Sequence, residues 1–272
     1  MKVIVSDIDG SLMPIGDGNK LDQKVIDAMI QLQEMGYTIL LNSARVYEGV
    51  IDIARMIHLD QFGGYIISSN GCHAVDAKTN EVIFQYEIPK DDVMSFWHYC
   101  QSLHLEPAFY QPGYMVVADY TEGFALDHFN CNLDYLITEH PDDHLNKPVI
   151  KCAIAQDPDT LKKTKEQVNQ WLIEHTQMFI SGGIPTLYDV IDRRSSKDKA
   201  VERILEHIGC TWKDTTVIGD GLSDVDSIRK AHFGVTLQDS NPACQAVCDL
   251  LLPPIKEEGY MVWLNKLLNK EI

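Results

Sequence analysis

The feature that most constrains this chain is the alternation of short apolar runs with helix-like patterns near its N-terminus. Strand-like runs occupy residues 3–6, 38–41 and 65–67, and two segments with apolar residues at helical spacing separate them. Strands that alternate with helices favour a parallel sheet covered by helices. The sequence therefore predicts an α/β fold with a parallel sheet at its core.

The middle of the chain follows a different pattern, in which helices are paired with hairpins. A hairpin is expected around Pro112-Gly113, and a strand over residues 149–154 leads into a long polar helix. The strand–helix alternation returns from Leu187 onward. We therefore expect a smaller α+β domain inserted into the first one. The expected boundaries are 1–82 and 187–272 for the core and 83–186 for the insertion.

Size and charge limit the classes of function. A chain of 272 residues is long enough for two modest domains. Its formal net charge is -17, and no cluster of lysines and arginines stands out. Such a surface repels nucleic-acid backbones and anionic membranes, so we expect neither as a partner. A small anionic substrate would need a metal ion or a focused cationic site.

The ends and the cysteines indicate a cytoplasmic protein. Met1-Lys2 runs straight into a strand, so no signal peptide is expected, and no apolar run is long enough to span a bilayer. The seven cysteines are scattered and odd in number, which favours reduced thiols. Zinc binding by Cys244 and Cys248 is not expected, because no second Cys/His pair lies nearby. The oligomeric state stays open.

Acidic residues follow two of the expected strands. Asp7 and Asp9 come directly after the first strand, and Asp220 and Asp224 come after a strand over residues 215–218. Such acids also occur in turns and as helix caps. Here, however, they follow the carboxyl ends of strands, where open parallel sheets form their ligand sites. Converging carboxylates would repel one another without a divalent cation, and oxygen ligands suit Mg²⁺.

Other residues at the same edge suit phosphoryl chemistry. Ser43 and the Ala44 amide follow the second strand at the start of a helix, where anions bind favourably. Lys197 begins another helix and supplies a cation. Lys199 would point about 200° away from Lys197 on that helix, towards solvent. A carboxylate nucleophile, a second acid, a lysine and a metal can together attack phosphorus through an aspartyl-phosphate.

Four segments carry a family resemblance. VIVSDIDGSL, LLNSAR, SSKDKAV and VIGDGLSDVDSI resemble, in order, the four motifs of the haloacid dehalogenase superfamily. The long insertion after the third strand resembles the Cof-like sugar phosphatases, which carry a large α/β cap. This resemblance implies a Rossmann-like core with an inserted cap. It also implies a Mg²⁺-dependent phosphatase that hydrolyses small phosphorylated metabolites, most of all sugar phosphates, through an aspartyl-phosphate.

Residue roles follow from the same resemblance. Asp7 would be the nucleophile, and Asp9 would protonate the leaving alcohol and activate water. The implied catalytic residues are Asp7, Asp9, Ser43 and Lys197. The implied phosphate-binding residues are Ile8 (through its amide), Ser43, Ala44, Lys197 and Ser223. The implied metal ligands are Asp7, Asp9 (through its carbonyl), Asp220 and Asp224.

The chain departs from the motifs at three places. Ala44 and Asp198 stand where the family usually has Gly, and Ser223 stands where it usually has Asn. Asp198 would weaken phosphate binding if it faced the site. Asp189 is either a local partner or the equivalent of a family glutamate. Arg45 is expected to brace the loop after Ser43.

Two other functions share much of this pattern. A phosphomutase would use the same aspartyl-phosphate but protect it from water, and a non-catalytic phospho-receiver could use the same acidic pocket. The cap is expected to set the substrate, and its hairpin tip over residues 111–114 is one candidate contact.

Overall fold

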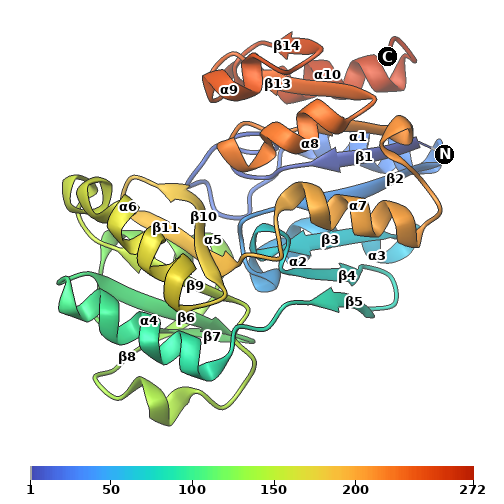
Figure 1. Ribbon diagram of the computed structural model, residues 1–272. Coiled ribbons are helices and arrows are strands. Elements are labelled where there is room, and N and C mark those ends of the chain that lie inside the picture. Colours follow the sequence, from blue (N-terminus) through green and yellow to red (C-terminus); the bar gives the residue numbers. More distant parts are fainter. Residues whose placement is uncertain (1) are drawn as a thin grey trace.

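The computed structural model describes residues 2–272, and its larger unit is built on one eight-stranded sheet, which can be followed in Figure 1. The strand order is β14-β13-β12-β1-β2-β3-β4-β5. Strands β14 to β3 in this order are parallel, and β4 and β5 are antiparallel additions at one edge. The strands are β1 (Lys2–Ser6), β2 (Tyr37–Asn42), β3 (Gly64–Ser68), β4 (His73–Asp76), β5 (Val82–Gln85), β12 (Thr215–Ile218), β13 (Phe233–Leu237) and β14 (Leu250–Leu252).

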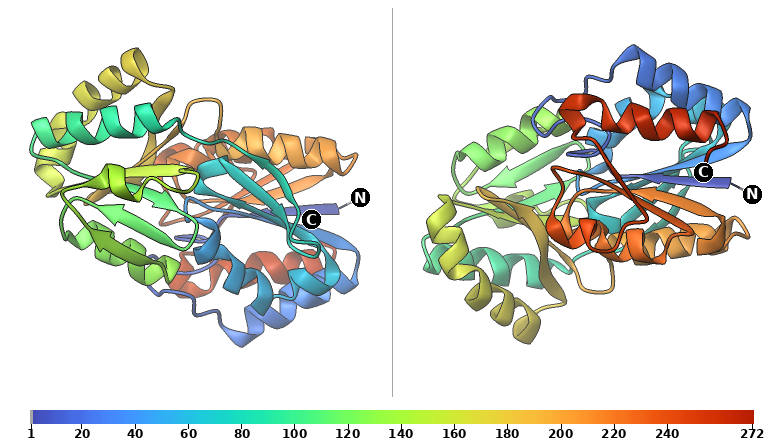
Figure 2. Two further views of the ribbon diagram at one scale, coloured as in Figure 1. Left: turned by 90° about the horizontal axis from the view of Figure 1, so that it is seen from below. Right: turned by 90° about the horizontal axis from the view of Figure 1, so that it is seen from above.

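Helices cover both faces of this sheet, which confirms the predicted α/β fold with a parallel core (Figure 2). Side chains alternate along β1, so Ile4 packs on one face while Val3 and Val5 pack on the other. On the Ile4 face lie α1 (Gln23–Glu34), α2 (Tyr47–Met56), α3 (Leu59–Phe62) and α10 (Gly259–Leu268). On the opposite face lie α7 (Lys197–His207), α8 (Val225–Lys230) and α9 (Pro242–Gln245).

A second, six-stranded sheet forms the smaller unit, with the order β10-β11-β9-β6-β7-β8. The predicted hairpin is confirmed, because Phe109 pairs with Val116 across β6 and β7. The strands are β6 (Glu106–Gln111), β7 (Tyr114–Val117), β8 (Asp134–Ile137), β9 (Lys151–Ala155), β10 (Met178–Ile184) and β11 (Leu187–Asp192). Helices α4 (Lys90–Ser102) and α6 (Pro158–His175) pack on one face, and α5 (Glu122–Cys131) packs on the other.

The strand pairing differs from the expected boundaries at both ends of the insertion. Strand β5 lies wholly in the first sheet, and β11 lies in the second sheet although the expected boundary assigns it to the core. The physical reason is a tight turn, because Ile184 and Leu187 face each other across β10 and β11. We propose that the two sheets define two domains, with the chain crossing between them after β5 and after β11. We call the smaller one the cap.

Short 3₁₀ helices complete the described chain. They are η1 (Ser69–Gly71), η2 (Pro141–His144), η3 (Trp212–Asp214), η4 (Leu222–Asp224) and η5 (Ile255–Glu257). In residues 2–272 no helix has both the length and the apolar character required to cross a membrane.

A buried histidine on β4 gives the core a testable pH dependence. His73 is 7% exposed, its Nδ1 lies 3.1 Å from Ser68 Oγ, and its ring packs edge-on against Tyr47. Burial lowers the pKa of His73 to about 4. The unfolded chain binds this proton near pH 6.5. The contribution of neutral His73 to the free energy of unfolding is therefore complete above pH 6.5. It is lost as the pH falls towards 4.

We expect this loss to reach about 3 kcal/mol. The measurement is the free energy of unfolding in urea at pH 7 and pH 4.5 for the wild type and for His73→Asn, which cannot titrate. The variant is expected to lose less stability than the wild type on acidification. The exposed His98 provides the control, because His98→Asn should behave as the wild type. Equal losses in wild type and His73→Asn would contradict the prediction.

Candidate active site

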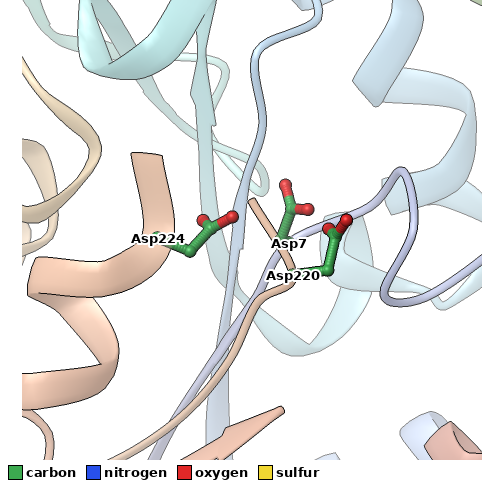
Figure 3. Close-up of side chains that lie close together, drawn as sticks. All are labelled: Asp7, Asp220 and Asp224. Atoms are coloured by element: carbon green, nitrogen blue, oxygen red, sulfur yellow. The ribbon is translucent and has the colours of Figure 1, made fainter. Parts of the chain in front are cut away.

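Three neighbouring strands deliver polar residues to one edge of the core sheet. Ser6 on β1 pairs with Leu41 on β2 and with Ile218 on β12, so these parallel strands end side by side. The residues that follow the strand ends therefore meet, as the sequence predicts. Figure 3 shows the side chains of Asp7 and Asp220 side by side and pointing the same way, with the side chain of Asp224 directed towards them. Carboxylate oxygens of these three residues lie within 4.8 Å of one another.

A glycine allows the chain after β1 to pass next to Asp220. Gly10 has φ +84°, a conformation that other residues rarely adopt. A Cβ atom at this position would lie 2.3 Å from Asp220 Oδ2. The next residue, Ser11, donates a hydrogen bond to Asp220 Oδ1 at 3.2 Å. The glycine of the first motif thus provides the room in which Asp220 approaches Asp7.

Lys197 lies among these carboxylates at the start of α7. Its Nζ is 2.6 Å from Asp7 Oδ1 and 2.9 Å from Asp224 Oδ1, and the residue is 3% exposed. Burial lowers its pKa, but the charges of Asp224 and Asp7 outweigh this effect and raise the pKa of Lys197 above its usual value. The ammonium group therefore stays charged. Lys199 is exposed, as expected from the helical spacing.

The three carboxylates repel one another despite this lysine. Burial, followed by the negative charges of Asp7 and Asp224, raises the pKa of Asp220 to about 9. Burial and the charge of Asp7 raise the pKa of Asp224 to about 6, although Lys197 acts in the opposite direction. A cluster of oxygen donors with excess negative charge fits a hard divalent cation such as Mg²⁺. The donor set therefore suits the metal that the sequence predicts.

The carboxylate of Asp9 points to a different partner from that of Asp7. Arg45 binds it through two nitrogens, with Nη2 2.6 Å from Oδ1 and Nε 2.7 Å from Oδ2. Arg45 also donates to the carbonyl oxygens of Gly18 at 3.1 Å and of Asn130 on α5 at 2.7 Å. One guanidinium group thus joins Asp9, the loop after β1 and the cap. The backbone amide of Arg45 also donates to Ser43 Oγ at 3.1 Å.

Replacement of Arg45 by lysine should release Asp9 while keeping a positive charge. A lysine cannot reproduce the two parallel hydrogen bonds or reach all the carbonyl groups. We expect a loss of turnover on the order of 100-fold, because Asp9 would no longer be held in one orientation. Steady-state kinetics of phosphate release give the measurement, with Arg55→Lys on the exposed part of α2 as the control. Unchanged kcat in Arg45→Lys would show that this ion pair does not position Asp9.

The remaining predicted phosphate-binding residues are placed as follows. Ser43, Ala44 and Ser223 line a cavity above the three carboxylates, together with Asp9 and Lys197. The side chain of Ile8 is fully buried in the core, which leaves only its backbone available to a ligand. Asp198 does not face the site. Its carboxylate accepts hydrogen bonds from Lys230 at 2.7 Å and from Ser196 at 2.5 Å.

The cap supplies the opposite wall of the cavity. Lys151 on β9 is 1% exposed, and its Nζ lies 2.7 Å from Asp189 Oδ1 and 3.4 Å from Asp127 Oδ2. Asp189 also accepts a hydrogen bond from Asn70 Nδ2 in the core at 3.0 Å. For Asp189, the structure shows neither a helix cap nor a partner close in sequence. The cavity has a volume of about 190 Å³.

The sequence analysis does not predict two of these cap residues, Asp127 and Lys151. It also names the hairpin tip over residues 111–114 as a candidate contact, and the tip lies elsewhere. Asp127 lies on α5, a helix that the sequence pattern does not predict, and Lys151 is hidden inside an apolar strand. The hairpin tip is one candidate substrate contact, but Gly113 donates its amide to Glu48 on α2 at 2.8 Å. Gln111 lines a separate cavity. The hairpin tip thus does not line the cavity that holds Asp7, and its contact with substrate stays a prediction.

An α/β fold of two sheets, with three carboxylates and a lysine at the edge of the parallel one, is typical of a class of hydrolases. The model of the haloacid dehalogenase-like hydrolase family matches residues 4–264. The chain belongs to this family, as the four motifs imply.

Curated relatives and solved structures resemble the chain over nearly its whole length. The candidate phosphatase YxeH of Bacillus subtilis is 25% identical over 250 residues, with 89% of this chain and 88% of the relative covered. An HMP-PP phosphatase of Yersinia pseudotuberculosis is 24% identical over 248 residues, with 87% and 83% covered.

Among solved structures, a haloacid dehalogenase-like hydrolase from Bacteroides thetaiotaomicron has a TM-score of 0.89 at 22% identity, covering 98% of this chain and 99% of that chain. A sugar phosphatase of subclass IIB has a TM-score of 0.76 at 22% identity, covering 95% and 96%. These structures share the fold of the chain, including its cap.

Proposed function

We propose that this hydrolase is a Mg²⁺-dependent phosphatase that acts on small phosphorylated metabolites, in particular sugar phosphates, through an aspartyl-phosphate. The observation that carries the proposal is the contact of Lys197 with Asp7 inside the group of three carboxylates, of which Asp7 and Asp224 are buried. A nucleophilic carboxylate, a permanent cation and a metal-binding donor set meet at one point. Relatives named as phosphatases, and a sugar phosphatase with the same fold, support the choice of substrate class.

In this proposal Asp7 Oδ attacks the phosphorus atom, and the bond to the leaving alcohol breaks. Lys197 neutralises the phosphoryl oxygens, with help from Ser43 Oγ, Ser223 and the amides of Ile8 and Ala44. A Mg²⁺ ion held by Asp7, Asp220, Asp224 and the Asp9 carbonyl would add positive charge next to the phosphoryl group. Water then hydrolyses the aspartyl-phosphate and regenerates Asp7.

Asp9 is the proposed general acid and base. It donates a proton to the leaving alcohol in the first step and takes a proton from the attacking water in the second. Arg45 binds its carboxylate through two nitrogens and so fixes its orientation. The seven cysteines are free, which agrees with the cytoplasmic setting that we propose.

The test is phosphate release by the purified full-length protein. Para-nitrophenyl phosphate and a panel of sugar monophosphates are incubated with the protein in Mg²⁺ and, separately, in excess chelator. We expect release of phosphate in Mg²⁺ and a loss of at least about 100-fold in the chelator. Isomerised sugar phosphate without free phosphate would identify a phosphomutase instead. No reaction with any ester would leave the non-catalytic receiver as the better description.

A further inference from the structure

The cap wall of the cavity holds a buried charged group that the proposed chemistry does not use. We call Asp127, Lys151 and Asp189 the cap triad. Lys151 and Asp189 are 1% and 4% exposed, and Lys151 Nζ also lies 4.8 Å from the centre of the Tyr110 ring. Tyr110 donates its hydroxyl to Asp127 Oδ2 at 2.6 Å. All three members of the triad line the same cavity as Asp7 and Lys197.

The triad offers no net positive charge to a ligand. One ammonium group faces two carboxylates. Burial lowers the pKa of Lys151, but Asp127 and Asp189 outweigh this effect and raise it, so the lysine stays charged. Burial raises the pKa of Asp189. The triad is negative if Asp189 is ionised and neutral if it is protonated. A second anionic group on the substrate would therefore find no free counter-charge there.

The charges of all the residues that line the cavity also disfavour a second anionic group. Among its described lining residues, carboxylates outnumber the cations Arg45, Lys151 and Lys197. The carboxylates are those of Asp7, Asp9, Asp127, Asp189, Asp220 and Asp224. Arg45 is already paired with Asp9, and Lys197 with Asp7 and Asp224. A bound divalent cation next to Asp7 would serve the transferred phosphoryl group, which leaves the cap side without excess positive charge.

The shape and the remaining chemistry limit the leaving group further. The volume of about 190 Å³ is below the roughly 300–1,000 Å³ of common small-molecule pockets. Of the described residues, no aromatic side chain lines the cavity, so a nucleobase would have nothing to stack against. The carboxylates of the triad accept hydrogen bonds from hydroxyl or ammonium groups. Ile15, Leu126 and Ile184 contribute apolar surface.

We propose that the cap triad selects phosphomonoesters whose leaving group is small, carries hydroxyl or amino hydrogen-bond donors and has no second anionic group. This inference rests on the proposed phosphatase function and narrows its substrate class. It excludes sugar bisphosphates and phosphorylated sugar acids as good substrates. It places the selection on the cap, away from the reacting atoms.

The experiment compares substrates whose leaving groups carry, or lack, a second anionic group. A hexose monophosphate and its amino-sugar counterpart are measured against the matching sugar-acid phosphate and a hexose bisphosphate. For the full-length wild-type protein in Mg²⁺, we expect kcat/KM at least about tenfold higher for the first two. Asp127→Asn keeps the size of the side chain and an acceptor for Tyr110 but removes one negative charge. We expect it to reduce this ratio by about tenfold.

The exposed cap residue Asp143 gives the control, because Asp143→Asn should keep the wild-type ratio. Equal kcat/KM for both kinds of substrate, or an unchanged ratio in Asp127→Asn, would overturn the inference. Turnover of para-nitrophenyl phosphate shows separately whether the protein is a phosphatase. Calorimetric binding of the same four esters to Asp7→Asn measures the selection without turnover. If Asp7→Asn bound the bisphosphate or the sugar-acid phosphate more tightly than the other two esters, the inference would be overturned. This result would count even if the protein hydrolysed none of them.

Discussion

Asp7→Asn is expected to lower phosphate release by a factor on the order of 10⁴ or more, since the amide oxygen cannot attack phosphorus as a carboxylate does. Asp7 is the carboxylate that contacts Lys197 at 2.6 Å and lies at the centre of the site. The substitution nearly preserves side-chain volume, so packing around β1 should remain. Phosphate release under saturating substrate is one measurement, and the covalent phospho-protein detected by intact mass is the other.

Two comparisons separate the nucleophile from the metal ligand. Asp220→Asn weakens the acidic cluster but keeps Asp7, so it should lose activity that higher Mg²⁺ partly restores. Asp7→Asn should show no such recovery and no phospho-protein at any Mg²⁺ concentration. Full activity of Asp7→Asn would falsify the assignment of the nucleophile.

Lys197→Met is expected to lower both activity and stability. Removal of the buried ammonium group leaves Asp7 and Asp224 without their shared partner, and breaking a buried ion pair costs about 3–5 kcal/mol. Loss of the cation next to the phosphoryl oxygens should reduce kcat on the order of 100- to 1,000-fold. Thermal unfolding and steady-state kinetics measure the two effects.

The stability effect should depend on the metal. A divalent cation bound by the same carboxylates would relieve part of their repulsion, so Mg²⁺ should raise the melting temperature of Lys197→Met more than that of the wild type. The control is Lys199→Met, two residues further along α7 on its exposed side. A Lys197→Met protein that melts with the wild type in the absence of metal would contradict the prediction.

The sequence predicts the core well because the information there is local. Strand β12 spans residues 215–218 as expected, and the acids after it meet Asp7 because parallel strands end at one edge. The convergence of the three carboxylates and Lys197 can therefore be inferred from the order of strands and motifs alone. The close approach of Gly10 to Asp220, by contrast, is visible only in the structure.

The cap is less predictable because its signals are ambiguous. The return of the strand–helix alternation at Leu187 indicates the core, but a hairpin turn before Leu187 keeps β11 in the cap sheet. Helix α5 has a weakly segregated apolar face, so its spacing does not stand out. Lys151 carries a usable signal, because a lysine inside an apolar strand needs buried partners. Only the tertiary structure reveals these as Asp127 and Asp189.

The proposed reacting groups and the cap triad belong to different sheets, and this separation has an evolutionary consequence. The groups that we propose to react with phosphorus follow strands of the eight-stranded sheet, whereas the cap triad belongs to the inserted six-stranded unit and its helix α5. Substitutions at Asp127, Lys151 or Asp189 can therefore retune substrate preference while the phosphoryl-transfer apparatus is inherited intact. A lineage carrying this architecture could acquire new substrates by drift in the insertion alone.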